Sequence, residues 1–354
     1  MSLPPVEIPL GAMRFNSDSQ KLEYFNGEIW MQIHTFSPDL DGGARGLITG
    51  QLEFPATTSV NIVYVTISTA GDATDFGDLS QERGGLAAVG SRTRGVFMGG
   101  QTENPDAFRN TIDYVEFAST SNATDFGDLN DTSSYQKGLS NNTRGINAGG
   151  YNPTINDIID YITIASAANA VDFGNLAQTT GGGPGGAASS TRGVFSGGYH
   201  PSPALTSLNV LQYITIATTG NTQDFGDMTT LRSHNAQANS STRSVIAMGY
   251  NKTPSTGSYD NQETSEYYTF ATLGNSVNFG DMIASTGYSP GGCSNCIRGL
   301  WSGGSAIVNT IQYVSIATLG DAVDFGDLNS GVKGGWLGAC SNGHGGLDNG
   351  NITF

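Results

Sequence analysis

Three groups of residues in this chain have types and spacings that could carry out chemistry. An Asp-Phe-Gly triplet, which supplies a magnesium-binding aspartate in protein kinases, begins at Asp75. Cys293 and Cys296 have the spacing of half a zinc site, with Cys340 and His344 as the nearest further ligands. Loop tyrosines and histidines offer flat rings that could stack on sugars or pack against a protein. The three groups correspond to phosphoryl transfer, metal binding and ligand binding.

The Asp-Phe-Gly triplet is repeated, which favours a structural role. It recurs six times, once with Asn in place of Asp, and its phenylalanines are Phe76, Phe126, Phe173, Phe225, Phe279 and Phe325. The chain lacks the glycine-rich loop and the catalytic-loop Asp and Asn that accompany the triplet in kinases. We therefore expect each phenylalanine to wedge against a neighbouring unit, each glycine to permit a positive φ, and the flanking aspartates to close Asx turns onto their own backbone.

Two further series run at the same period of about 50 residues. One is an arginine before an apolar run that ends in glycine: Arg45, Arg94, Arg144, Arg192, Arg243 and Arg298. The other is a tyrosine that opens an alternating strand: Tyr64, Tyr114, Tyr161, Tyr213, Tyr267 and Tyr313. Three series in phase identify a six-fold repeat. We expect the arginines to pair with the aspartates of the triplet across neighbouring units, as a weak ladder of exposed ion pairs.

Each repeat unit contains four short segments with the character of strands. Residues 84–89 are a run of small residues, residues 94–100 are apolar, and residues 213–218 alternate β-branched side chains as a half-buried strand does. The Asp-Phe-Gly motif closes the unit. The chain also contains 50 glycines, which disfavour helices because each costs about 1 kcal/mol relative to alanine there. An all-β fold follows.

The order of these segments resembles the kelch repeat over residues 45 to 341, with phenylalanine where kelch repeats usually carry tryptophan. The resemblance implies a kelch-like six-bladed β-propeller, and four strands in about 50 residues is the size of one blade. The first unit lacks its small-residue strand, while residues 334–340 form one without a unit. We therefore predict that this C-terminal strand completes the first blade and removes an open edge. A seventh blade that uses the N-terminal segment is the alternative.

The loops at the two faces of such a disc differ in length. From tyrosine to phenylalanine the distance is 12 residues in every repeat, as from 64 to 76, whereas Gly100 to Tyr114 is 14 and Gly304 to Tyr313 is 9. Loops on a rigid scaffold often carry function, so the variable face is the predicted binding face. Its candidate residues are Tyr135, Tyr151, Tyr199, His200, His234, Tyr250, Tyr259 and Tyr288.

Composition excludes several functions. The chain has 31 acidic and 15 basic residues, a net charge of −16, which disfavours binding to nucleic acid. No apolar stretch approaches the roughly 20 residues that cross a bilayer, and the N-terminus lacks the features of a signal peptide. We interpret residues 293–296 as a loop and predict no metal site, no cofactor and no catalytic residue, because the aspartates follow the repeat. Calcium at the aspartate-rich turns is left open.

Residues 11 to 33 stand outside the repeat. Three short strand-like segments occur here, with Asn26-Gly27 as a hairpin turn between the last two. The segment resembles a short module of bacteriophage tail-fibre and other virion proteins. The resemblance implies an anchoring role for Phe15, Tyr24 and Trp30. We divide the chain into an N-terminal β-hairpin anchoring segment (1–40), a propeller (41–343) and a tail (344–354).

Together the two resemblances imply a structural protein of the virion, with other virion proteins or a host-surface glycan or receptor as partners. It would serve as a tail fibre, baseplate or decoration component, and it could form homo-oligomers. The alternatives are a non-viral kelch-type module that binds proteins and, less favoured, a propeller enzyme active on glycans, since catalysis needs acids and bases that break the repeat.

Overall fold

The computed structural model describes residues 8–16, 21–32, 44–53, 57–103, 106–178, 180, 183–200, 206–252, 259–283, 287–304, 308–329, 332 and 334–347. The chain divides into two compact units, residues 1–43 and 44–354. The boundary predicted at residue 40 lies outside the described residues. The described residues are all β, apart from one short 3-10 helix, Gly345–Leu347, and they include no helix long and apolar enough to cross a membrane.

The first unit is a three-stranded antiparallel sheet. Its strands, in sheet order, are β1 (Met13–Asn16), β2 (Lys21–Phe25) and β3 (Trp30–Gln32). The predicted hairpin is confirmed, but its turn contains four residues, 26–29, and not only the predicted pair Asn26-Gly27. The Asn26 side chain closes it by accepting hydrogen bonds from the amides of Glu28 at 3.0 Å and Ile29 at 2.9 Å.

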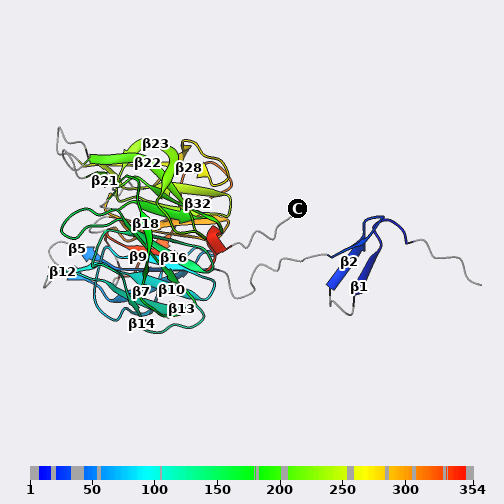
Figure 1. The fold of residues 1–354 in the computed structure, drawn as a ribbon, viewed down its shortest axis with the longest axis horizontal. Helices are drawn as coiled ribbons and strands as arrows, with labels where there is room; N and C mark the ends of the chain where they lie inside the picture. The colour runs from blue at the N-terminus through cyan, green and yellow to red at the C-terminus, as the bar shows by residue number, and fades with distance from the viewer. Residues whose placement is uncertain are drawn as a thin grey trace, which may run out of the picture. The chain divides into compact units, whose positions relative to one another are not determined.

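The second unit contains six main antiparallel sheets, here called sheets I to VI (Figure 1). Five have four strands, and sheet IV has a fifth, because the short strand β21 (Tyr199–His200) also pairs with β22 (Thr206–Thr215). Sheet I contains β34 (Gly338–Ser341), β4 (Arg45–Thr49), β7 (Asn61–Thr66) and β8 (Thr74–Asp78). Sheet II contains β9 (Ala87–Gly90), β10 (Arg94–Met98), β13 (Thr111–Glu116) and β14 (Thr124–Asp128). Sheet III contains β15 (Lys137–Ser140), β16 (Arg144–Ala148), β17 (Ile158–Thr163) and β18 (Val171–Asn175). Strands are numbered first to fourth in these orders.

The remaining three sheets repeat the arrangement. Sheet IV contains β19 (Gly185–Ala188), β20 (Arg192–Ser196), β22 (Thr206–Thr215) and β23 (Gln223–Arg232). Sheet V contains β24 (Ala236–Asn239), β25 (Arg243–Ala247), β28 (Thr264–Thr269) and β29 (Val277–Asp281). Sheet VI contains β30 (Gly291–Ser294), β31 (Arg298–Ser302), β32 (Thr310–Ser315) and β33 (Val323–Asp327).

Short strands occupy the segments between the second and third strands, where the sequence varies in length. They are β5 (Leu52–Glu53) with β6 (Thr57–Thr58), β11 (Gln101–Glu103) with β12 (Asp106–Phe108), β26 (Tyr250–Lys252) with β27 (Tyr259–Asn261), and β21 (Tyr199–His200), which pairs with β22. The third strands also start earlier than predicted. Tyr114, for example, is the fourth residue of β13, because the buried Ile112 before it pairs with Met98.

The C-terminal strand completes the sheet of the first repeat, as predicted. β34 pairs with β4, with Cys340 opposite Leu47 and Gly338 opposite Thr49. The first strands also touch in a cyclic order, since β9 contacts β15, the contacts continue through β19, β24 and β30, and β34 contacts both β30 and β9. The first and last repeats are therefore neighbours in space.

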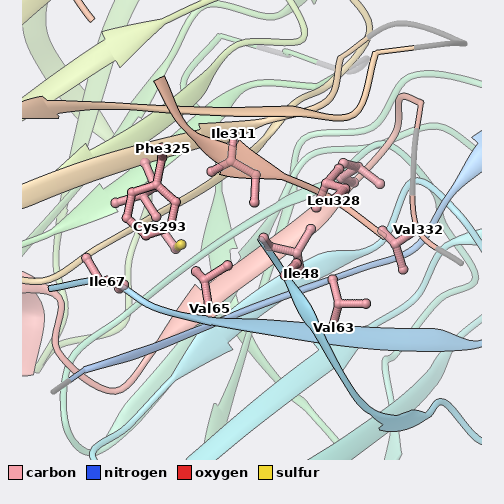
Figure 2. Close-up of a cluster of buried hydrophobic side chains, with 12 residues drawn as sticks. Ile48, Val63, Val65, Ile67, Cys293, Ile311, Phe325, Leu328 and Val332 are labelled. Carbon is pink, nitrogen blue, oxygen red and sulfur yellow. The ribbon is translucent and has the colours of Figure 1, made fainter. Parts of the chain in front are cut away.

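The hydrophobic core lies between neighbouring sheets. Phe76 of sheet I packs in one cluster with Phe97 and Phe117 of the second repeat, so the phenylalanine of the triplet forms the predicted wedge. The same arrangement joins the last repeat to the first. Figure 2 shows side chains of sheet I against those of the sixth repeat: Ile48, Val63, Val65, Ile67, Ile311, Phe325 and Leu328.

The repeated arginines do not pair with the aspartates of the triplet, contrary to expectation. Each guanidinium lies over the tyrosine ring of its own sheet. The distance from the guanidinium carbon to the ring centroid ranges from 4.2 Å for Arg243 to 5.1 Å for Arg45. Each also donates to a carbonyl just after the third strand of the next sheet, as Arg144 does to Ile216 at 2.8 Å. Arg298 of sheet VI donates to Ser68 at 2.9 Å, so this series is cyclic too.

The triplet's glycine allows the next repeat to approach closely. A Cβ on Gly77, whose φ is +151°, would lie 2.3 Å from the carbonyl oxygen of Ser121. The next amide along the chain, that of Asp78, donates a hydrogen bond to the side-chain oxygen of Asn122 in the next repeat, at 3.1 Å. At this amide the acceptor therefore belongs to the neighbouring turn, and the predicted Asx turn, in which an aspartate of the triplet would accept from its own backbone, is wrong. We call these tyrosine, arginine and triplet contacts the girdle.

Candidate functional site

Six equivalent residues surround the ends of the first strands. Each lies two residues before a first strand and has φ between +44° and +70°: Gly85, Tyr135, Gly183, His234, Ser289 and Trp336. Backbone hydrogen bonds link several of them in turn. The Tyr135 amide donates to Gly85 at 2.7 Å, the Gly183 amide to Tyr135 at 2.8 Å, and the Gly85 amide to Trp336 at 2.9 Å.

Small and large side chains alternate among these six positions. The three large rings meet: the centroid of Trp336 lies 4.6 Å from that of Tyr135 and 4.7 Å from that of His234. The small residues make room, since a Cβ on Gly85 would lie 3.1 Å from the Tyr135 ring. Left-handed backbone costs a non-glycine residue roughly 1–2 kcal/mol, so ring packing must offset strain at three positions. We call Tyr135, His234 and Trp336 the mouth triad.

Four tyrosines extend the mouth triad outward. Tyr250 is buried and stacks on His234 at 5.0 Å with an interplanar angle of 12°. Its ring also contacts Tyr199, Tyr259 and Tyr288, and its hydroxyl bonds to that of Tyr199. Tyr259 and Tyr288 are 47% and 40% exposed, so they present ring surface to solvent. These four tyrosines are the rim.

One cation lies beside the rings of the rim. The Lys252 ammonium lies 5.0 Å from the Tyr259 ring centroid and 5.7 Å from that of Tyr199, within the range of a cation–π contact. Burial raises the pKa of Tyr199 and Tyr250 and lowers that of His234 well below its usual value. The buried rings are therefore neutral at pH 7, which suits binding by stacking better than proton transfer.

Six of the eight predicted binding residues gather in this cluster: Tyr135, Tyr199, His234, Tyr250, Tyr259 and Tyr288. Tyr151 instead packs on Phe108 at 5.7 Å, and His200 is half-buried in the short strand β21. Sequence reasoning missed Trp336 because residues 334–340 were expected to be one strand, whereas β34 begins at Gly338. Its spacing before that strand, shared with Tyr135 and His234, was the available signal.

Two adjoining cavities of about 30 and 50 Å³ lie among the first strands. We call them the ring cavity. The larger one is closed partly by His344, whose Nε2 lies 3.0 Å from the Gly90 carbonyl oxygen and 3.3 Å from Ser140. Leu347 beyond it is buried. The predicted tail thus packs on the second unit through residue 347, and residues 348–354 lie outside the described residues.

The predicted anchoring residues lie on two faces of the first unit's sheet. Phe15, 66% exposed, and Tyr24 share one face with Met13, Leu22 and Met31, all of them exposed. Trp30 takes part in the opposite face. There the Arg14 guanidinium covers its ring at 4.1 Å, and Arg14 pairs with the buried Glu23 at 2.8 Å.

The three cysteines, all within the described residues, are thiols without a disulfide bond. Cys293 lies in β30, which ends at Ser294, so the interpretation of residues 293–296 as a loop is wrong for its first two residues. Burial raises the pKa of Cys293 to about 12, while Cys296 is exposed. Across the described ranges, no three His, Cys, Asp or Glu side chains are grouped so as to hold a metal ion.

No protein-family model and no curated protein matches the chain. The function must therefore be argued from the cluster itself.

Proposed function

We propose that residues 44–347 form a kelch-like six-bladed β-propeller and that this protein is a structural component of a bacteriophage virion. The mouth triad and the rim would bind a glycan of the host surface or a neighbouring virion protein. The first unit would attach the propeller to the particle. The observation that carries the binding proposal is the pair of exposed rings, Tyr259 and Tyr288, on one buried aromatic cluster.

The propeller proposal is supported by three cyclic series of contacts. The first strands, the arginine hydrogen bonds and the triplet turns each return from sheet VI to sheet I, as Arg298 to Ser68 and Asp327 to Asp72 illustrate. Six four-stranded sheets around an axis, with a terminal strand completing the first, would satisfy all three. Such closure leaves only short inner edges, which face the axis and are protected from aggregation.

The binding proposal is supported by the chemistry of the rim. Tyrosines offer a flat apolar face and a polar hydroxyl at low entropic cost, which is why they are frequent in binding sites for sugars and proteins. Lys252 adds a cation beside two of these rings. The buried hydroxyls of Tyr199 and Tyr250 bond to each other, so the cluster is organised before a ligand arrives.

The anchor proposal is supported by the apolar face of the first unit. A three-stranded sheet of this size is marginally stable alone, and one of its faces exposes Met13, Phe15, Leu22, Tyr24 and Met31. A neighbouring virion protein that covers this face would supply the missing burial. The face is the part of the unit that a docking partner would contact.

Binding at the rim is tested on an array of neutral and acidic bacterial surface polysaccharides. The wild-type protein should bind a subset, and Tyr259→Ala combined with Tyr288→Ala should lose at least tenfold in affinity. The matched control is Tyr151→Ala, which removes an exposed tyrosine of the same face outside the cluster. Binding that survives the double substitution would overturn the rim as the site.

The virion proposal is tested by electron microscopy with a gold-labelled antibody against this chain on intact particles from its source. Label at the distal tail would support host attachment, and label on the capsid, neck or tail shaft would support a structural or decorating role. Absence of label on any particle would remove the virion proposal and favour the non-viral kelch-type module. Deletion of residues 1–40 should abolish incorporation while the propeller still folds; normal incorporation would refute the anchor.

A further inference from the structure

The smaller part of the ring cavity contains a single cationic side chain. Lys137, the first residue of β15, lines this cavity of about 30 Å³ together with small residues such as Gly186 and Ala236. The five residues equivalent to Lys137 are Ala87, Gly185, Ala236, Gly291 and Gly338. One repeat in six therefore places an ammonium group where the others place hydrogen or methyl.

The Lys137 ammonium is poorly satisfied. Among the described residues its one acceptor is the carbonyl oxygen of Leu337, at 3.5 Å, which is at the limit of a hydrogen bond, whereas an ammonium has three donors. In the part of the chain that the structure describes, no carboxylate forms an ion pair with it. Lys137 is partly buried, and a charge that is withdrawn from water in this way is normally paired, because it loses hydration without replacement.

The group is nevertheless charged at neutral pH. Burial lowers the pKa of Lys137 to about 8, which leaves most of it protonated at pH 7. The His234 ring, which interacts electrostatically with Lys137, is neutral at pH 7, because burial and the charges of Lys137 and Lys252 lower its pKa well below its usual value. His234 therefore adds no second positive charge at pH 7. Of the described residues that line this part of the cavity, Lys137 is the one with a positively charged side chain.

Backbone amides of the first strands face the same cavity. Hydrogen-bonding directions alternate along an antiparallel strand, so residues two apart point their amides the same way. The Gly90 and Asn239 amides point away from their second strands, to the hydroxyls of Ser140 and Ser294, both at 3.1 Å. The amides of Ala88 and Gln237, two residues earlier and lining the cavity, must then also point away from their second strands, and so must the carbonyls of the same two residues.

We propose that this part of the ring cavity is a binding site for one small monovalent inorganic anion of halide size, held by the Lys137 ammonium and by inward-facing amides. The volume of about 30 Å³ accommodates one or two water-sized occupants, which matches a single halide. Leu86 and Leu337 are among the residues that line it. The anion supplies the negative charge that the surrounding side chains do not.

The experiment is crystallography of the full chain grown in sodium bromide, with anomalous diffraction at the bromine edge. The expected result is a bromide peak within hydrogen-bonding distance of the Lys137 Nζ, lost in Lys137→Met. Lys252→Met is the matched control, because it removes a lysine outside the cavity, and it should retain the peak. A cavity that contains only water in the wild-type crystal would overturn the proposal.

A solution measurement on the wild-type protein keeps the test independent of the variant's folding. Thermal unfolding is compared in sodium bromide and in sodium gluconate at equal ionic strength, since gluconate is too large to enter. The melting temperature should be higher in bromide by about 2 °C or more, as for a ligand that binds only the folded state. Lys137→Met should abolish this difference and Lys252→Met should keep it. Equal melting temperatures of the wild-type protein in the two salts would refute the site.

Discussion

The girdle and the six positions that precede the first strands, here called the mouth, use the same repeated backbone in opposite ways. In the girdle every repeat places arginine over tyrosine, tyrosine edge-on to phenylalanine, and a triplet against the next turn. At the mouth, six equivalent residues alternate between small and large. A girdle side chain meets only its own repeat and the next, so identical residues fit six times. At the mouth the side chains converge, and six large rings would not fit.

The difference teaches where this chain can vary. A change in the girdle alters a close contact with a neighbouring repeat, so it should cost stability. At the mouth, removal of a ring loses packing but can also relieve the strained backbone beneath it. Such a change should therefore lower the stability less than a girdle change does, and lower the binding affinity more. The predictions below separate these two responses.

The largest effect is expected from Gly127→Ala in the girdle. Gly127 has φ +144°, and a Cβ there would lie 2.6 Å from the carbonyl oxygen of Ala168, a backbone atom that cannot move aside cheaply. We expect a loss of about 3 kcal/mol in the free energy of unfolding, measured by chemical denaturation. Gly220→Ala is the control, since its φ is +154° and its Cβ would meet no atom within 4 Å. Equal losses for both would show that strain, not the contact, matters.

A smaller loss is expected from Arg144→Met. This change removes the cation over the Tyr161 ring at 4.7 Å and the hydrogen bond to the Ile216 carbonyl at 2.8 Å. The unfolding free energy should fall by about 2 kcal/mol. Arg144→Lys keeps the charge without the planar fork and should be intermediate. A lysine variant as stable as the wild type would mean that the fork geometry is unimportant.

Acid should destabilise the folded protein through His344, which lines the larger part of the ring cavity. Burial lowers the pKa of His344 to about 4, from an ordinary value near 6.5. Between these values the unfolded chain binds a proton that the folded chain does not, so stability falls as pH decreases from 6.5 to 4 and is regained as pH rises. The wild type should lose about 1–2 kcal/mol more than His344→Gln across this window, by denaturation at each pH. Parallel profiles would contradict this.

The smallest effect on stability is expected at the mouth, from Tyr135→Gly. The change loses the packing of Tyr135 on Trp336 but relieves a φ of +61°. The two terms oppose, so the unfolding free energy should change by about 1 kcal/mol or less. Tyr135→Ala keeps the strain and should be less stable than the glycine variant by about 1 kcal/mol. If alanine and glycine are equivalent, the strain at this position is negligible.

Most of the regular structure could be predicted from the sequence, because it depends on local pattern. Alternation predicted the strands, the period predicted six units, and the unpaired C-terminal run predicted that β34 pairs with β4. The partner of the arginines could not be predicted. Which group lies beside Arg144 depends on where the third strand of the next sheet ends, and Ile216 is 72 residues away.

The candidate site was predictable as a set of residue types but not as an arrangement. Tyr250 and Tyr288 were candidates as loop aromatics, yet only the fold brings their rings to 5.6 Å. Lys137 carried no signal, because a lysine among small residues in a short strand is ordinary until that strand lines a cavity. Trp336 required the register of β34 before its equivalence to Tyr135 became visible.

The sequence by itself determined the repeat, the strands and the acidic charge, because alternation, turn residues and composition act over a few neighbouring residues. Tertiary structure alone decided which side chains meet: arginine on tyrosine, three rings at the mouth, and one ammonium in the ring cavity. Those contacts join residues tens to hundreds of positions apart. Their energies depend on distance, burial and the absence of competing partners, which exist only once the sheets have packed together.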